Sequence, residues 1–190
     1  MDHAKRAREL FLEGYNCAQA VACAFDDLTG LDRETAARLS SSFGGGMGRL
    51  REVCGTVSGA LLVLGMLCGY SDPGDPSAKI EHYHLVQEFA RRFREINGTI
   101  ICRELLAGVK TKPGNEPEER TAEYYERRPC LRHVGEAAQI VEELLRERGI
   151  ALEAGAASGE MNGIAGGAGA GSEEMSGIAG EAGGNSGGTK

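Results

Sequence analysis

Apolar residues recur along the first 148 residues at spacings of three and four, the signature of amphipathic helices. Near the start, Ala7, Leu10 and Phe11 share one face of a predicted helix. Further helices are predicted at 17–28, 32–43, 54–68, 77–96 and 121–128, with a short turn at 99–106. The last helix opens at Pro129, and its inner face comprises Val134, Ala137, Ala138, Val141, Leu144 and Leu145. No segment alternates as a strand would, so the sequence predicts an all-α, compact bundle of about six helices.

The chain changes character at Gly149. Residues 149–190 divide into three gapless blocks of 14 residues, each of which begins with Gly-Ile-Ala. One large apolar residue per block returns less free energy on burial than ordering the glycine-rich backbone costs. We therefore predict a cysteine-containing helical domain at 1–148 and a disordered, low-complexity tail at 149–190 without chemistry of its own.

Charge and composition argue against two classes of function, nucleic-acid binding and membrane insertion. The 190 residues carry a formal net charge of -7, and 41% of them are hydrophobic. An acidic balance argues against a nucleic-acid partner. The most apolar run, from Val57 to Cys68, is too short to cross a membrane, and no signal peptide is recognisable at the N-terminus. The expected location is the cytoplasm, where thiols stay reduced.

Six cysteines are the main chemical signal, and no two form a C-x-x-C pair. Each of four stands at or near the predicted start of a different helix: Cys17, Cys54, Cys102 and Cys130. Backbone N–H groups and the helix dipole favour negative charge there, so we expect depressed thiol pKa values and a redox or metal-binding role. Cys23 and Cys68 fall inside or late in their helices, where a cysteine usually packs as a small hydrophobe.

Residues beside these cysteines suggest supporting roles. The segment 44–48 is rich in glycine but has no phosphate-binding motif, and we expect it to let backbone approach the Cys54 site closely. Arg49 and Arg51 are candidates to offset thiolate charge, or else solvated loop residues. Gly55 and Gly59 lie on one helical face and predict close helix packing. His133 follows Cys130 by three residues and is interpreted as a surface or hydrogen-bonded histidine.

With these residues identified, the chain resembles the redox-active protein family named for its C_GCAxxG_C_C pattern of four cysteines. The resemblance runs through 14–21, through 43–64 with Arg-Leu-Arg-Glu-Val-Cys-Gly at 49–55, and through 102–106 and Cys130. It implies that Cys17, Cys54, Cys102 and Cys130 form the site. Thr56 stands where the family pattern has alanine. Some relatives resemble haem or iron–sulfur proteins, but no C-x-x-C-H is present for covalent haem.

Four functions compete at this point. The first is electron transfer or redox sensing through an iron–sulfur cluster held by four thiolates. A zinc or other metal module ranks lower, because the paired spacings typical of zinc sites are missing. Thiol–disulfide exchange without metal and a non-catalytic helical interaction module are the alternatives. The sequence leaves open the redox partner, whether the protein is an enzyme and whether it forms homo-oligomers.

Overall fold

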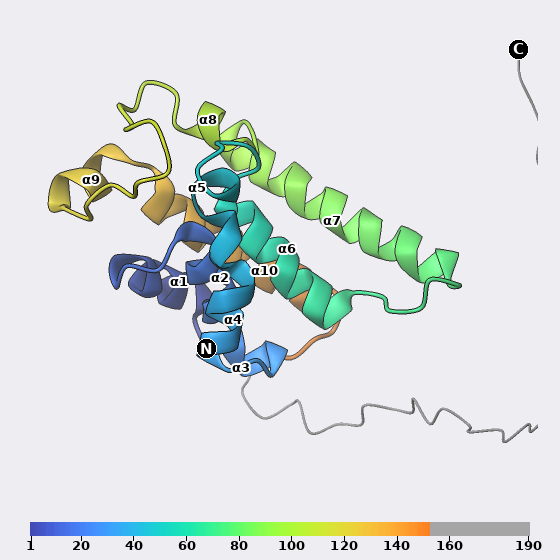
Figure 1. The fold of residues 1–190 in the computed structure, drawn as a ribbon. Helices are drawn as coiled ribbons and strands as arrows, with labels where there is room; N and C mark the ends of the chain where they lie inside the picture. Colours follow the sequence, from blue (N-terminus) through green and yellow to red (C-terminus); the bar gives the residue numbers. More distant parts are fainter. Residues whose placement is uncertain (153–190) are drawn as a thin grey trace, which may run out of the picture. The chain divides into compact units, whose positions relative to one another are not determined.

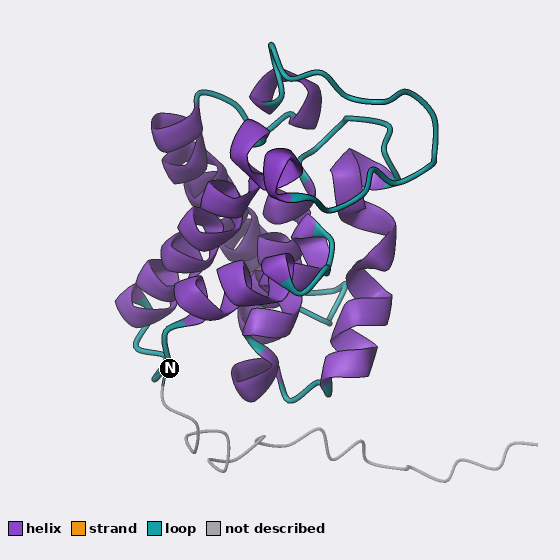
Figure 2. Cartoon of the chain, turned by 90° about the vertical axis from the view of Figure 1, so that its left-hand side faces the viewer, coloured by secondary structure: helices purple, strands orange, loops and turns teal. Residues whose placement is uncertain are grey.

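The computed structural model describes residues 1–152 and confirms the all-α fold (Figures 1 and 2). Within that range the helices of eight or more residues are α1 (His3–Leu12), α2 (Cys17–Ala24), α4 (Arg33–Ser40), α6 (Gly55–Cys68), α7 (Pro76–Asn97) and α10 (Cys130–Glu147). The described part contains no strand, only one isolated antiparallel bridge between Val53 and Ile101. The predicted number of main helices is therefore correct.

Short helical segments connect the main helices. They are α3 (Asp26–Thr29), the 3-10 turn η1 (Ser41–Phe43), α5 (Gly44–Met47), α8 (Cys102–Leu105) and α9 (Ala122–Arg127). The helix predicted over 17–28 is interrupted at Phe25, whose ring is fully buried. The helix predicted to run to residue 43 ends at Ser40 and continues as the 3-10 turn.

Helix starts follow local capping rules. Asn16 accepts from the backbone N–H groups of Ala18 and Gln19, and the Gln19 side chain accepts from the Asn16 N–H, which completes a capping box at the start of α2. Asp2, Asp32, Asp75 and Thr121 cap α1, α4, α7 and α9 in the same general way. These signals are local, which is why the sequence places the helix starts well.

Two close helix pairs build the core. α1 packs along α10, and α2 packs along α6 (Figure 1). A Cβ atom at Gly59 of α6 would lie 2.5 Å from the carbonyl oxygen of Ala18 of α2, so only glycine allows this approach. The expected packing role of Gly59 is thus confirmed. All six residues of the predicted inner face of α10 are buried.

Two further sequence predictions concern membrane spans and the domain boundary. None of the helices in residues 1–152 combines the length and apolarity that a membrane crossing requires. Nearly all of the repeat tail predicted at 149–190 lies outside the described residues, so the domain boundary at 148 stays a prediction.

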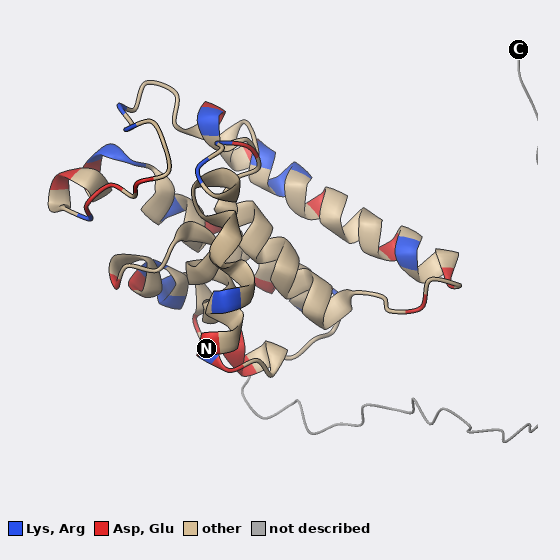
Figure 3. Ribbon diagram, in the orientation of Figure 1, with Lys and Arg blue, Asp and Glu red and all other residues tan. Residues whose placement is uncertain are grey.

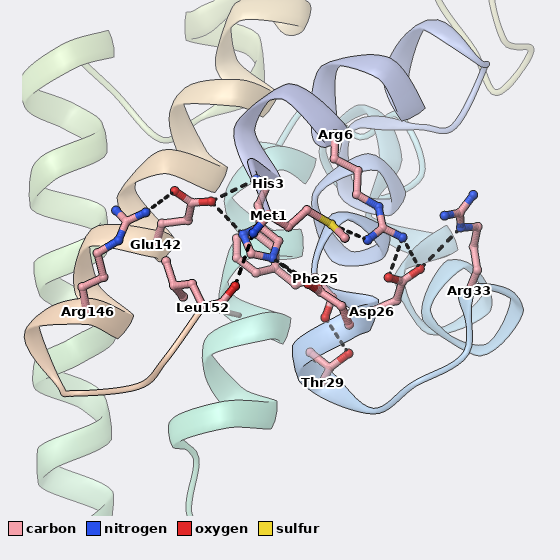
Figure 4. Close-up of polar contacts among 11 residues, drawn as sticks. Met1, His3, Arg6, Phe25, Asp26, Thr29, Arg33, Glu142, Arg146 and Leu152 are labelled. Carbon is pink, nitrogen blue, oxygen red and sulfur yellow. Dashed lines mark hydrogen bonds and ion pairs between the residues drawn. The ribbon is translucent and has the colours of Figure 1, made fainter. Parts of the chain in front are cut away.

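A buried histidine fastens the N-terminal helix to the core. His3 is fully buried, with its ring stacked on Phe25 at 4.3 Å between centroids. Its Nδ1 lies 2.7 Å from a Glu142 carboxylate oxygen, and its Nε2 lies 3.1 Å from Asp27 (Figure 4). Both ring nitrogens face carboxylates, and only the protonated imidazolium can donate to both. The His3 N–H also donates to Glu142.

Replacing His3 with leucine is expected to lower the free energy of unfolding by about 3 kcal/mol or more, since Glu142 and Asp27 then lose a buried partner. Urea unfolding measures the loss. The control is His84→Leu, because His84 is exposed on α7. Equal stabilities for the two variants would contradict a stabilising role for the buried histidine.

The same cluster predicts a dependence of stability on pH. Burial acts to raise the pKa of Glu142, but hydrogen bonds from His3 and Arg146 outweigh it and hold the pKa below the ordinary 4.5. The stabilisation is therefore complete above about pH 4.5 and is lost as pH falls through the lower folded-state pKa. We expect the stability difference between wild type and Glu142→Gln to shrink below pH 4.5 in urea titrations. A difference that grows on acidification would be inconsistent with this pairing.

Candidate functional site

Four of the six cysteines surround one cavity. Cys17, Cys54, Cys102 and Cys130 all line a hollow of about 210 Å³. Cys17, Cys102 and Cys130 are the first residues of α2, α8 and α10, and Cys54 is the N-cap of α6. The tertiary fold thus brings together four thiols that are distant in sequence, each from the start of a different helix. All four are free thiols.

Glycine makes room for the first thiol. A Cβ atom at Gly55 would lie 3.0 Å from the Cys17 sulfur and 2.6 Å from the carbonyl oxygen of Phe43. The capping box at Asn16 fixes the start of α2, so Cys17 faces the start of α6 at this point. Gly55 therefore belongs to the site geometry as well as to helix packing.

A short backbone ladder joins the second and third thiols. The Cys54 N–H donates to the Ile100 carbonyl at 2.8 Å, and the Cys102 N–H donates to the Glu52 carbonyl at 2.7 Å. With the bridge between Val53 and Ile101, these bonds hold Cys54 and Cys102 on two adjacent extended segments. Nothing in the sequence periodicity signals this pairing, because each segment is only a few residues long.

The glycine-rich segment lies at the cavity and approaches Cys102 closely. Gly46 has a φ of 72°, and a Cβ atom there would lie 2.7 Å from the Cys102 Cβ. Gly44 and Gly45 line the same cavity as Cys54. The ladder between the segments before Cys54 and Cys102 carries Cys102 under the glycine loop.

The two candidate arginines have separate roles. Arg51 Nη1 lies 4.0 Å from the Cys102 sulfur, close enough for its charge to act on that thiol. Arg49 instead donates to the carbonyl oxygens of Gly114 and Lys112, at 2.8 and 2.7 Å, and so tethers the loop after α8 beside the cavity. Of the two, only Arg51 has a thiol within reach.

Sequence reasoning missed two further arginines that line the cavity. Arg120 donates to the Phe11 and Tyr15 carbonyls and stacks over the Phe11 ring at 4.5 Å. Arg128 pairs with Glu118 and lies over the Tyr124 ring at 4.7 Å. The only sequence signal for Arg128 was its place two residues before Cys130, while the contacts of Arg120 span more than 100 residues.

Burial overturns the expected thiol chemistry. Desolvation raises the pKa of Cys130 to about 12, with the nearby Cys17 adding to the rise. Burial likewise raises the pKa of Cys54, by more, and that of Cys102, where a hydrogen bond from Arg51 opposes the shift. The prediction of depressed pKa values at the helix starts is therefore wrong for these three thiols. Removing a thiolate from water costs more than the helix dipole returns.

His133 is a further residue of the cavity wall, not a surface histidine. It is 2% exposed, and burial lowers its pKa to about 4, so the ring is neutral at pH 7. Its ring meets Phe93 edge-to-face at 5.9 Å. A neutral ring adds no charge to the site.

The remaining two cysteines lie elsewhere. Cys23 is fully buried in α2, and its sulfur lies 3.7 Å from the carbonyl oxygen of Arg33. Cys68 is half-buried at the end of α6. Neither lines the cavity, as helix spacing predicts for residues six and fourteen positions from Cys17 and Cys54.

The donor geometry differs from that of a closed single-ion site. Among residues 1–152, no three or more His, Cys, Asp or Glu side chains are grouped as one metal ion would need them. The four sulfurs thus share a cavity without forming a compact tetrahedral cage of the kind that structural zinc requires.

Comparison with known proteins identifies the family of this chain. No curated protein and no solved structure matches the chain. One family model does match, over residues 15–144, and that range contains all four cavity cysteines. The chain therefore belongs to the family described as "Putative redox-active protein (C_GCAxxG_C_C)".

Proposed function

We propose that Cys17, Cys54, Cys102 and Cys130 form one redox centre by holding an iron–sulfur cluster, for electron transfer or redox sensing. The observation that carries the proposal is the convergence of four thiols, from four helix starts, on one cavity. Four cysteine thiolates are the usual ligand set of such clusters.

The donor set fits a cluster better than a single ion. A cluster contains several metal atoms, so its ligand sulfurs stand farther apart than those around one ion. Four sulfurs line a cavity of about 210 Å³, and no compact single-ion group is found among residues 1–152; a cluster is therefore the metal centre that we propose. Three of the four thiols are on helices of eight or more residues, whose N-terminal N–H groups favour negative charge.

Burial of the thiols supports a ligand role over a nucleophilic one. The high pKa values of Cys54, Cys102 and Cys130 keep these thiols protonated and weakly nucleophilic at neutral pH. Metal binding displaces thiol protons, so a raised pKa does not prevent ligation, although it makes loading depend on pH.

The chain's own residues would shape the centre. When bound, the cluster supplies an acceptor and donor of single electrons. Phe11, Leu105, Leu106 and Tyr124 line the cavity and limit water, while Arg51 and Arg128 place positive charge beside the sulfurs. Low exposure and nearby positive charge are two means by which a protein sets a reduction potential.

Thiol–disulfide exchange is the second candidate, and the free state of all four clustered cysteines favours it. Two cavity thiols would then form a bridge on oxidation, releasing two electrons and two protons. Mass spectrometry after mild oxidation tests this candidate. A bridge between two cavity cysteines in metal-free protein supports it, and four unmodified thiols count against it.

The test of the cluster is anaerobic purification and reconstitution of the full chain with iron and sulfide. We expect visible charge-transfer absorption, with iron and acid-labile sulfide bound in stoichiometric amounts. A colourless protein without iron would overturn the proposal, and tightly bound zinc without sulfide would replace it with a redox-inert metal site.

A further inference from the structure

The wall of the cavity carries an excess of positive charge. Four arginines and one glutamate line it, together with the four cysteines and a neutral histidine. Basic stretches in the loop after α5 and at the end of α9 contribute to this wall (Figure 3). Positive charge that is removed from water, as at the buried Arg128, is costly unless negative charge offsets it.

The positive charge of Arg128 is only partly balanced by nearby negative charge. Its side chain is 4% exposed and pairs with Glu118, but the same carboxylate also accepts from Arg127 at 3.2 Å. The Nε of Arg128 is buried and has no hydrogen-bond partner. A buried guanidinium donor without an acceptor is costly, so its persistence suggests a partner that the protein acquires from outside.

The positive charge of Arg51 has still less compensation than that of Arg128. Within residues 1–152 no ion pair includes it, and the nearest acceptor of its Nη1 is the Cys102 sulfur at 4.0 Å. Its Nη2 is buried and has no partner. Arg51 and Arg128 both line this cavity, and the positive charge of each acts to lower the pKa of Cys102.

We propose that the cavity is a binding site for a small tetrahedral oxyanion, which Arg51 and Arg128 hold through their unpartnered N–H groups. Guanidinium groups match oxyanions in charge and in donor geometry. The helices α6 and α10, which have no side-chain cap, begin at the same cavity, and their N-terminal N–H groups add to its preference for an anion.

This inference stands on the arginines and does not depend on the cluster. A cluster with four thiolate ligands would also be a negative occupant of the same cavity. The oxyanion is therefore a ligand of the metal-free protein, and cluster and oxyanion exclude one another.

The experiment is calorimetric titration of inorganic phosphate into the metal-free, reduced full chain under argon at low ionic strength. We expect saturable binding of one phosphate per chain. Arg51→Gln weakens that binding by about tenfold or more, because a hydrogen bond between charged groups is lost. Arg103→Gln removes the same charge one residue from Cys102 but outside the cavity, where Arg103 pairs with Glu52, and it retains binding.

Four outcomes overturn the inference: no saturable binding, equal affinity in wild type and Arg51→Gln, equal loss in both arginine variants, or equal affinity for phosphate and for its glycerol ester. A phosphate-induced rise in the thermal midpoint of wild type, absent in Arg51→Gln, gives an independent readout of the same binding. Glycerol phosphate distinguishes a free oxyanion from a phosphorylated headgroup, and binding of the ester with equal affinity would contradict the small-anion site. If the protein binds phosphate but takes up no iron, the oxyanion site stands and the proposed cluster is ruled out.

Discussion

Replacing Cys102 with serine is expected to abolish the visible absorption of the reconstituted protein and to reduce its bound iron by more than about tenfold. Mutating a residue that only hydrogen-bonds to a metal ligand already lowers metal affinity by about tenfold or more, and loss of the ligand itself should cost at least as much. Cys102 is the first residue of α8, and its thiol is buried in the cavity wall. Serine preserves the shape of the side chain but replaces a soft sulfur ligand with a hard hydroxyl. Anaerobic reconstitution followed by spectroscopy and iron analysis measures the effect.

The matched control is Cys68→Ser. Cys68 is half-buried at the far end of α6 and does not line the cavity, so this variant should load iron as wild type does. Wild-type iron content in the Cys102→Ser variant would contradict the assignment of Cys102 to the site. Loss of iron in both would indicate that serine disturbs the fold rather than ligation.

A methyl group at Gly46 is expected to damage both stability and the site. Its Cβ would lie 2.7 Å from the Cys102 Cβ in a backbone conformation that favours glycine. Gly48→Ala separates the cost of a positive φ from the cost of the steric overlap. Gly48 has a positive φ too, but the atom nearest to a Cβ there would be 3.9 Å away. We expect Gly48→Ala to cost about 1 kcal/mol of backbone strain. Gly46→Ala should cost about 2 kcal/mol more through overpacking.

Urea unfolding of the two alanine variants measures this difference, and iron loading shows whether it reaches the site. Gly46→Ala should load less iron than Gly48→Ala, since Cys102 must shift to admit the methyl group. Equal stability and equal loading in the two variants would show that the glycine loop does not position Cys102.

The helix starts of the site could be predicted because their signals are local. Asn16 with Gln19 and Pro129 each lie within a few residues of the cysteine they position, so reading the sequence places Cys17 and Cys130 at helix N-termini. Family resemblance and helix position both selected the same four cysteines. That they share one cavity follows only from the packing of α2, α6 and α10.

The electrostatics of the site could not be predicted in the same way. Helix position alone favours low thiol pKa values, but the pKa follows burial, which is a property of the whole fold. The approach of Arg51 to Cys102 depends on the short ladder between residues 52–54 and 100–102. Arg120 reaches the site across more than 100 residues, and no local pattern signals such a contact.

The most direct test of the central claim is an anaerobic reductive titration of the reconstituted protein, followed by visible spectroscopy and by a count of free thiols after each step. The account predicts that the visible absorption decreases as the centre accepts electrons and returns on reoxidation, with no disulfide among the four cavity cysteines at either end. An absorption that does not respond to reductant would contradict a redox centre. If a disulfide between two of these cysteines takes up the electrons instead, the redox chemistry belongs to the thiols alone.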